Sequence, residues 1–184
     1  MITDPSAIRD ARPEDWEGIW PFFHGIVAAG ETYTYEPGMS KPEGRRMWMV
    51  GPPGRTVVAA DSDGVIVGTA HMYANRQGPG SHVASASFMV DPRQGRRGIG
   101  RALGEDVIEW ARESGFRAIQ FNAVVETNGP AVALWRSLGF EGWGQCRRRS
   151  VILATATLDC SSCIDFSDAG PCAAFAARRR RGQV

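Results

Sequence analysis

The feature that most constrains this chain is a glycine-rich loop, Val90–Leu103 (VDPRQGRRGIGRAL), between a strand pattern and a helix pattern. Gly95, Gly98 and Gly100 stand in this loop, and glycine lets backbone N–H groups approach a bound anion closely. The helix that follows adds a favourable dipole at the same point. Because arginines flank the glycines, the loop predicts a binding site for a diphosphate.

Two common phosphate-binding loops do not match this spacing. A Walker loop needs Gly-x-x-x-x-Gly-Lys and then Ser or Thr; Gly95 and Gly100 have the spacing, but Arg101 replaces the lysine. A dinucleotide-binding fingerprint needs a third glycine where Leu103 stands, and it follows a first parallel strand. Since hairpin strands precede this loop, neither nucleotide-binding motif fits.

Hydrophobic periodicity and turn residues predict ten elements in the order β-α-α-β-β-β-α-β-α-β. Ser40 and Glu43 have capping-box spacing at the start of the second helix, and Asp61–Gly64 is typical of a hairpin turn. Antiparallel hairpins followed by a β-α-β unit predict an α/β (α+β) fold with a mixed sheet. Strands are expected at 7–11, 56–60, 65–73, 83–90, 118–125 and 140–143, and helices at 12–30, 40–49, 98–114 and 128–138.

The length, hydropathy and charge of the chain limit the kinds of partner that we expect it to bind. The chain has 184 residues and 43% hydrophobic content, enough for a globular core. No apolar run reaches the roughly 18 residues of a membrane span, and the polar N-terminus is unlike a signal peptide, so we expect a cytoplasmic protein with no membrane partner. Residues 1–144 carry 14 basic and 17 acidic side chains, so we expect no nucleic-acid partner.

The loop and a second motif together resemble the GNAT superfamily of N-acetyltransferases. Val90-x-Pro92, followed by Gly98-Ile99-Gly100 and Arg-Ala-Leu, is similar to motif A of that family. Asn128–Phe140 (NGPAVALWRSLGF) is similar to motif B. The segment 31–37 (ETYTYEP) is similar to the substrate-facing segment of phosphinothricin-type members. The resemblance covers residues 7–144 and implies a GNAT fold, with a mixed central sheet that is splayed at the CoA site and flanked by helices.

The resemblance also implies an acetyl-CoA-dependent acyltransferase in which an amine attacks the thioester directly. The backbone of Phe88, Met89 and Val90 is expected to pair with the pantetheine arm, and Asn128 to contact the arm near its thiol end. A strand N–H at Met89 or Val90 is expected to stabilise the developing oxyanion. No metal is expected. The backbone N–H groups expected to hold the pyrophosphate are those of Arg96, Arg97, Gly98, Ile99, Gly100 and Arg101.

Two positions depart from the family pattern. The place three residues before the first motif glycine, usually Arg or Gln, is Gly95. The place after Leu134, where many members carry a Tyr that acts as a general acid, is Trp135. An indole N–H donates a hydrogen bond but cannot supply a proton, so water or the substrate is expected to protonate the thiolate.

The acceptor amine must lose a proton, which calls for a base or a water path. Glu31 is our candidate catalytic base because its segment is expected to line the acceptor pocket; a solvated loop carboxylate is the alternative. Glu36, His71 and Glu126 are further candidates. Tyr33 and Tyr35 are interpreted as pocket walls or as core residues.

From Gln145 onward the family pattern ends. All four cysteines lie here, and Cys160-x-x-Cys163 has no second ligand pair nearby for zinc, so free thiols are expected. We predict a GNAT domain at 1–144 and an atypical, partly disordered tail at 145–184, and hypothesise that a reading-frame shift produced this tail. Ser150–Thr157 (SVILATAT) is β-prone and is the candidate closing strand.

The glycine-rich loop predicts how acetyl-CoA binds, but it does not indicate which amine receives the acetyl group. A small primary amine is our interpretation, and acylation of a protein N-terminus or lysine is the alternative within enzymes. A non-catalytic acyl-CoA-binding or sensor protein is an alternative of another class, which Trp135 and the tail favour. A homodimer is left open.

Overall fold

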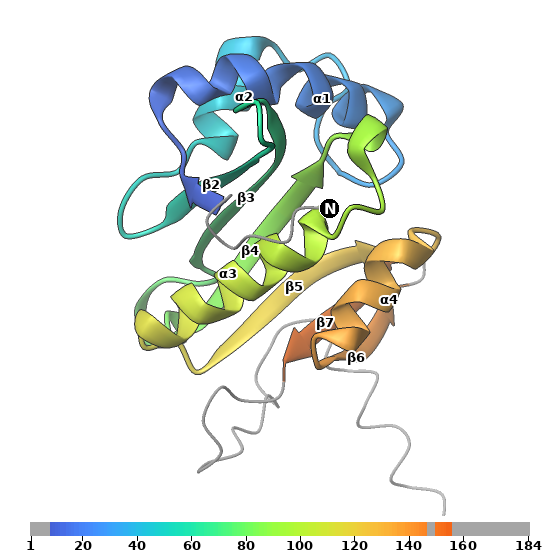
Figure 1. Ribbon diagram of the computed structural model, residues 1–184. Coiled ribbons are helices and arrows are strands. Elements are labelled where there is room, and N and C mark those ends of the chain that lie inside the picture. Colours follow the sequence, from blue (N-terminus) through green and yellow to red (C-terminus); the bar gives the residue numbers. More distant parts are fainter. Residues whose placement is uncertain (1–7, 147–149, 156–184) are drawn as a thin grey trace, which may run out of the picture.

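The computed structural model describes residues 8–146 and 150–155 (Figure 1). They form a mixed seven-stranded sheet with helices packed on both faces, which confirms the predicted fold class. The strands are β1 (Ile8–Asp10), β2 (Arg55–Ala60), β3 (Ile66–Ala74), β4 (Val83–Val90), β5 (Ala118–Val125), β6 (Phe140–Cys146) and β7 (Ser150–Thr155). The α-helices are α1 (Trp16–Ala29), α2 (Lys41–Trp48), α3 (Ile99–Glu113) and α4 (Gly129–Ser137), and short 3₁₀ turns are η2 (Pro13–Asp15), η3 (Gly78–Gly80) and η4 (Pro92–Gln94).

The helix ends follow the capping chemistry of the sequence. The predicted capping box of α2 is present, with the Ser40 N–H donating to Glu43 Oε2 at 2.9 Å. The first helix starts differently from the prediction: the chain makes the 3₁₀ turn η2 first, and the α-helix begins at Trp16. The Asp15 carboxylate accepts the Arg12 N–H at 2.6 Å and so holds this tighter first turn in place.

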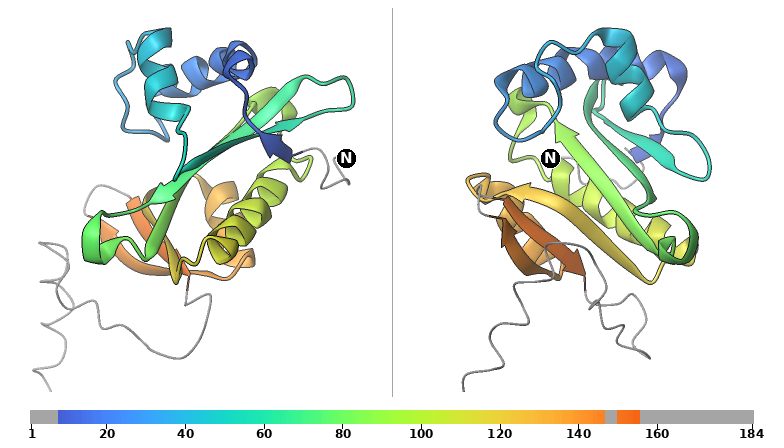
Figure 2. Two further views of the ribbon diagram at one scale, coloured as in Figure 1. Left: turned by 90° about the vertical axis from the view of Figure 1, so that its left-hand side faces the viewer. Right: turned by 180° about the vertical axis from the view of Figure 1, so that it is seen from behind.

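The sheet order is β1-β2-β3-β4-β5-β7-β6, and β4–β5 is its parallel pair. Within the described residues, β4 and β5 pair only where Val83 and Ala84 lie opposite Ala118 and Ile119. Beyond that point the two strands diverge (Figures 1 and 2). The candidate closing strand is present as β7, which lies antiparallel between β5 and β6 and so continues the sheet.

Two hydrophobic cores cover the two faces of the sheet. The core under α1 and α2 contains Trp16, Ile19, Phe23, Val27, Trp48 and Met89. The core under α3 and α4 contains Ile99, Leu103, Val107, Ala111, Phe121 and Trp135, with Phe88 and Val90 packed against it. Side chains therefore alternate along β4: Met89 points to the first core, and Phe88 and Val90 point to the second.

Of the predicted tail, residues 145–146 and 150–155 are described, and they lie in β6 and β7. The boundary at residue 144, the tail's disorder and the reading-frame hypothesis stay predictions, because the remaining tail positions, Cys160 and Cys163 included, lie outside the described residues. In the part of the chain that the structure describes, none of the helices has the length and apolar character that crossing a bilayer requires.

Candidate functional site

The divergence of β4 from β5 leaves one edge of β4 open. At the two ends of the β3–β4 pair, the Asn75 N–H donates to the Val83 carbonyl at 2.8 Å and the Asp91 N–H donates to the Val67 carbonyl at 3.0 Å. In an antiparallel pair, hydrogen bonds between the strands occur at every second residue. Since Val83 and Asp91 bond to β3, the odd-numbered residues of β4 between them also bond to β3. The backbone groups of its even-numbered residues therefore point towards β5.

This alternation separates the three strand residues that were predicted to hold the pantetheine arm. Phe88 and Val90 present their N–H and C=O groups to the open edge of β4. Met89 is opposite Thr69, and its backbone groups point to β3 instead. The sequence could not distinguish these residues, because the hydrogen-bonded side of a strand depends on its register with its neighbour.

Tyr33 approaches this open edge from the loop between α1 and α2. Its hydroxyl donates to the Phe88 carbonyl at 2.6 Å and accepts from the Phe88 N–H at 3.2 Å. Burial raises the pKa of Tyr33 above its ordinary value, so the hydroxyl stays protonated and remains a donor. Tyr33 thus connects the segment predicted to face the acceptor with the strand predicted to face the donor.

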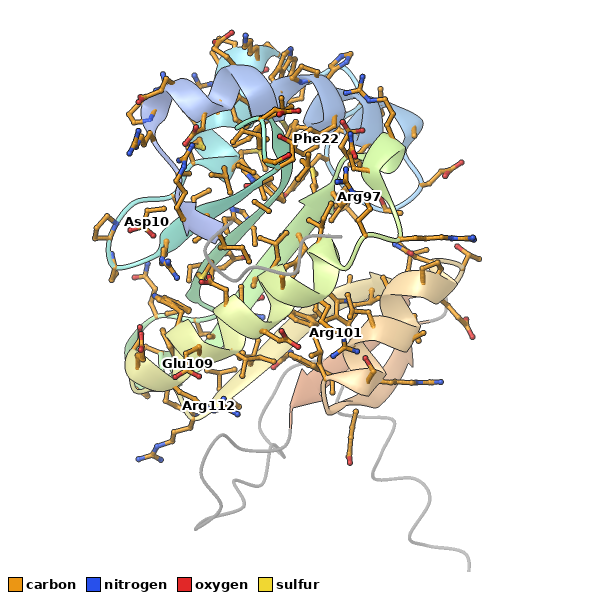
Figure 3. All side chains as sticks on the ribbon, viewed as in Figure 1. Asp10, Phe22, Arg97, Arg101, Glu109 and Arg112 are labelled. Carbon is orange, nitrogen blue, oxygen red and sulfur yellow. The ribbon has the colours of Figure 1, made fainter. Side chains whose placement is uncertain are left out.

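The N-terminal end of α3 faces the same region. The first hydrogen bond of the helix runs from the Ala102 N–H to the Gly98 carbonyl at 3.0 Å, so the N–H groups of the residues before Ala102 are not used by the helix itself. Figure 3 shows Arg97 on the loop before α3 and Arg101 in its first turn. The Arg101 guanidinium donates to Ser137 Oγ of α4 at 2.7 Å. Oriented N–H groups and two arginines make this end of α3 suited to a diphosphate.

One cavity of about 760 Å³ joins these parts. All of the residues predicted to bind the donor line it, from Phe88, Met89 and Val90 through Arg96–Arg101 to Asn128. On its other side the cavity is lined by Ile26, Thr32, Tyr33, Thr34, Tyr35, Tyr73, Ser85 and Ser87. A donor along the open edge of β4 and an acceptor among these hydroxyl-bearing side chains would therefore share one continuous space.

Glu31 is not among the residues that line this cavity, although its neighbour Thr32 is. The Glu31 side chain is exposed, as is that of Glu36. Its role as the base stays a prediction.

His71 lies behind the hydroxyl-bearing side chains of the cavity, next to Tyr73. It is buried, its ring stacks on Trp48 at 4.4 Å, and its Nδ1 is 3.2 Å from the Trp48 carbonyl oxygen. A carbonyl can only accept, so this contact places the proton on Nδ1. Burial lowers the pKa of His71 to about 4, so the ring is neutral near pH 7. His71 contacts the cavity-lining ring of Tyr73 at 5.4 Å but does not line the cavity itself.

Two residues of the second motif, Asn128 and Trp135, line the cavity on the side that is predicted to hold the donor. Asn128 accepts the Ala131 N–H through Oδ1 at 3.3 Å, so it caps α4 as well as lining the cavity. Trp135 is buried against Phe88 and Phe121, with ring centroids 4.6 and 4.8 Å away. Trp135 therefore packs directly beneath the strand residue to which Tyr33 is bonded.

Comparison with known families agrees with this geometry. The profile of the acetyltransferase (GNAT) family matches residues 14–140. The chain belongs to the GNAT family. The predicted family and enzyme class are thereby confirmed: the protein is an acyltransferase of the N-acetyltransferase type.

Two N-acetyltransferases are similar to this chain in sequence. The L-amino acid N-acetyltransferase AaaT of Escherichia coli (strain K12) is 30% identical over 141 residues, which cover 73% of this chain and 82% of that protein. The N-acetyltransferase aca1 of Schizosaccharomyces pombe is 33% identical over 75 residues, 41% of this chain, and the match spans only 36% of that relative's length.

Solved GNAT structures share the architecture. A GCN5-related N-acetyltransferase from Kribbella flavida has 51% sequence identity and a TM-score of 0.76, covering 82% of this chain and 97% of that one. A phosphinothricin acetyltransferase from Sinorhizobium meliloti, solved in complex with acetyl-CoA, has 23% identity and a TM-score of 0.73, covering 89% and 95%. The second likeness concerns the fold alone.

Proposed function

We propose that this GNAT protein transfers the acetyl group of acetyl-CoA to the primary amine of a small, amino-acid-like acceptor. The observation that carries the proposal is the single cavity that joins the α3 N-terminus, the open edge of β4 and the hydroxyl-lined acceptor side. Similarity to an L-amino acid N-acetyltransferase supports the acceptor class, and the fold shared with an acetyl-CoA complex supports the donor.

The residues present fit acetyl-CoA in their chemistry. The N–H groups before Ala102, with Arg97 and Arg101, would hold the pyrophosphate. The open edge of β4 would take the amide groups of the pantetheine arm, as an added strand would, because β5 has diverged there. Asn128 also lines the cavity and would contact the arm near its thiol end.

The backbone of β4 would also supply the group that stabilises negative charge on the thioester oxygen. The N–H groups of Phe88 and Val90 both face the open edge, and the Phe88 N–H is bonded to Tyr33. An N–H of this edge, that of Val90 or that of Phe88 once released from Tyr33, would donate to the carbonyl oxygen as charge develops there. Its position in a pleated strand means that it is already oriented before the reaction.

Proton transfer would involve groups at the edge of the cavity. Glu31 stays our candidate for the base, acting through water from its exposed position beside Thr32. Glu31→Gln tests this role, because an unchanged pH dependence of kcat/KM would remove Glu31 as the base. The leaving thiolate would take its proton from water or from the substrate, since Trp135 offers only an indole N–H.

Steady-state release of free thiol tests the proposal. The assay would use acetyl-CoA with L-amino acids, simple alkylamines and short peptides with free N-termini or lysines. Turnover on single amino acids is the expected result, and turnover on peptides alone would favour a protein acetyltransferase. Binding of acetyl-CoA by calorimetry, without thiol release on any amine, would favour the sensor alternative, which the tightly packed Trp135 supports. Homodimer formation stays a prediction for sedimentation analysis.

A further inference from the structure

Two residues of β4, Phe88 and Val90, present both of their backbone groups to the open edge, beyond the point where Ala84 still pairs with β5. Acetyl-CoA carries amide groups along its arm and then the thioester carbonyl, so the arm has more donors and acceptors than one strand residue can satisfy. An arm laid along this edge, in the way that an added strand pairs, therefore needs the N–H and C=O groups of Phe88 as well as those of Val90.

The backbone groups of Phe88 are already bonded within the protein. The Tyr33 hydroxyl donates to the Phe88 carbonyl at 2.6 Å and accepts from the Phe88 N–H at 3.2 Å. One hydroxyl thus satisfies both groups, in the place that an amide or carbonyl of the donor would take. Because the N–H has a single hydrogen to share, Tyr33 and the donor compete for it.

The segment that carries Tyr33 lets the hydroxyl move without breaking a helix or a strand. Residues 30–40, between α1 and α2, form neither, and residues 34 and 36–38 are exposed. Other phenols lie beside Tyr33: its ring stacks on Tyr35 with centroids 5.3 Å apart, and Tyr73 lines the same cavity. Burial raises the pKa of Tyr33, and Tyr35 and Tyr73 raise it further, so the hydroxyl stays protonated. A hydroxyl released from Phe88 therefore has hydrogen-bond partners on the hydroxyl-lined side of the cavity.

We infer that Tyr33 is an internal competitor of acetyl-CoA: the donor displaces its hydroxyl from Phe88, and the released hydroxyl turns to the side of the cavity that is proposed to hold the acceptor. The free protein then keeps this part of the open edge satisfied until the donor arrives. Any free energy that the two Tyr33 bonds contribute to the free protein is lost from donor binding. The inference rests on the proposed function and deepens it, because the acceptor segment 31–37 then takes its final position only when the donor is bound.

Tyr33→Phe tests the competition, because it keeps the packed ring and removes only the hydroxyl. We expect calorimetry on the full-length protein to show a Kd for acetyl-CoA about three- to tenfold lower than in the wild type, the effect of about one net hydrogen bond. Tyr35→Phe is the matched control and should give no such gain, because the Tyr35 hydroxyl interacts with the Ser87 side chain rather than with Phe88. An unchanged or weaker affinity in Tyr33→Phe, or an equal gain in both variants, overturns the inference.

These binding measurements need no turnover, so the inference and the proposed function fail separately. A wild type that binds acetyl-CoA but acetylates no amine overturns the proposed function alone. A wild type that does not bind acetyl-CoA overturns both.

Amide hydrogen exchange shows which group holds the Phe88 N–H in each state. In the free protein the Phe88 amide should exchange at least about fivefold faster in Tyr33→Phe than in the wild type, since it loses its hydrogen-bond acceptor. With saturating acetyl-CoA the two proteins should exchange equally slowly, because the donor has replaced the hydroxyl. A difference that persists in the complex means that Tyr33 keeps its bond and overturns the inference. Should Tyr33→Phe not fold, the wild type alone decides: Tyr33 ring signals in the NMR spectrum that do not shift at saturating acetyl-CoA overturn the inference.

Discussion

Arg96, and not the adjacent Gly95, holds a left-handed backbone conformation in the loop before α3. Its φ is 64°, whereas Gly95 has φ −58° and ψ 158°, a conformation open to any residue. A left-handed backbone costs a residue with a Cβ roughly 1–2 kcal/mol, while glycine adopts it freely. The glycine that this turn requires therefore stands one position too early.

Exchanging the two residues should stabilise the protein. In Gly95→Arg/Arg96→Gly the composition, and so the entropy of the unfolded chain, is unchanged, and the left-handed strain is removed. A Cβ at position 95 would meet only the Pro92 carbonyl oxygen at 3.6 Å, an ordinary contact. We expect the free energy of unfolding, measured by urea denaturation, to rise by about 1 kcal/mol. Arg96→Ala keeps the Cβ and should give no gain; an equal gain in both variants would contradict this account.

Much of the fold could be predicted from local sequence. The bounds of β4 and β5 are as expected, because each is a run of strand-forming residues bounded by turn residues. The glycines, the asparagine cap and the two motifs predicted residues that prove to line one cavity, since their pattern depends on neighbours in sequence.

The rest depends on contacts that local patterns do not encode. Which residues of β4 present their backbone to the open edge follows from its pairing with β3, so Met89 could not be separated from Phe88 and Val90 beforehand. The Tyr33 contact with Phe88 requires a loop and a strand to meet in the folded chain. The conformation at Arg96 is likewise set by how the loop joins β4 to α3.

His71 predicts a loss of stability in mild acid. Its pKa is about 4 in the fold and about 6.5 in the unfolded chain, so between these values the unfolded state binds more protons. The free energy of unfolding should therefore fall as the pH drops from about 6.5 to about 4, by up to about 3 kcal/mol. Denaturant titrations at a series of pH values measure this slope.

His71→Gln removes the titrating group and keeps an N–H donor for the Trp48 carbonyl. The difference in stability between wild type and variant should vary with pH only in this window. Hydrogen bonds to Arg9 and Arg93 lower the pKa values of Asp15 and Asp91. These carboxylates therefore change the free energy of unfolding at pH values below this window, and equally in wild type and variant. A difference that does not change between pH 6.5 and pH 4 would exclude His71 as the source.

Gly68 should be intolerant of any side chain. A Cβ there would lie 2.7 Å from Ile99 Cγ2 and 3.2 Å from Leu103 Cδ1, so Gly68→Ala must displace the side chains by which α3 packs on β3. We expect a loss of about 1–3 kcal/mol in the free energy of unfolding. We also expect weaker acetyl-CoA binding, since Ile99 begins the helix whose N-terminus is proposed to hold the pyrophosphate. Gly25→Ala is the control: its Cβ meets open space within α1, and it should stabilise by about 0.5–1 kcal/mol. If Gly68→Ala is destabilised but binds acetyl-CoA with unchanged affinity, the packing of α3 on β3 does not control donor binding.

The Val90 N–H can be removed without disturbing the β3–β4 ladder. Because this N–H faces the open edge, proline at position 90 costs no hydrogen bond to β3, and Met89 already has the extended conformation that precedes proline. If the Val90 N–H stabilises the thioester oxygen, kcat of Val90→Pro should fall about 10²–10³-fold relative to Val90→Ala, which keeps the N–H. Circular dichroism and acetyl-CoA calorimetry on both variants would verify that the fold and the donor site persist. If the fold and acetyl-CoA binding are intact, a kcat for Val90→Pro within a few-fold of that for Val90→Ala would mean that another N–H group stabilises the thioester oxygen. The Phe88 N–H, released from Tyr33, would be the next group to test.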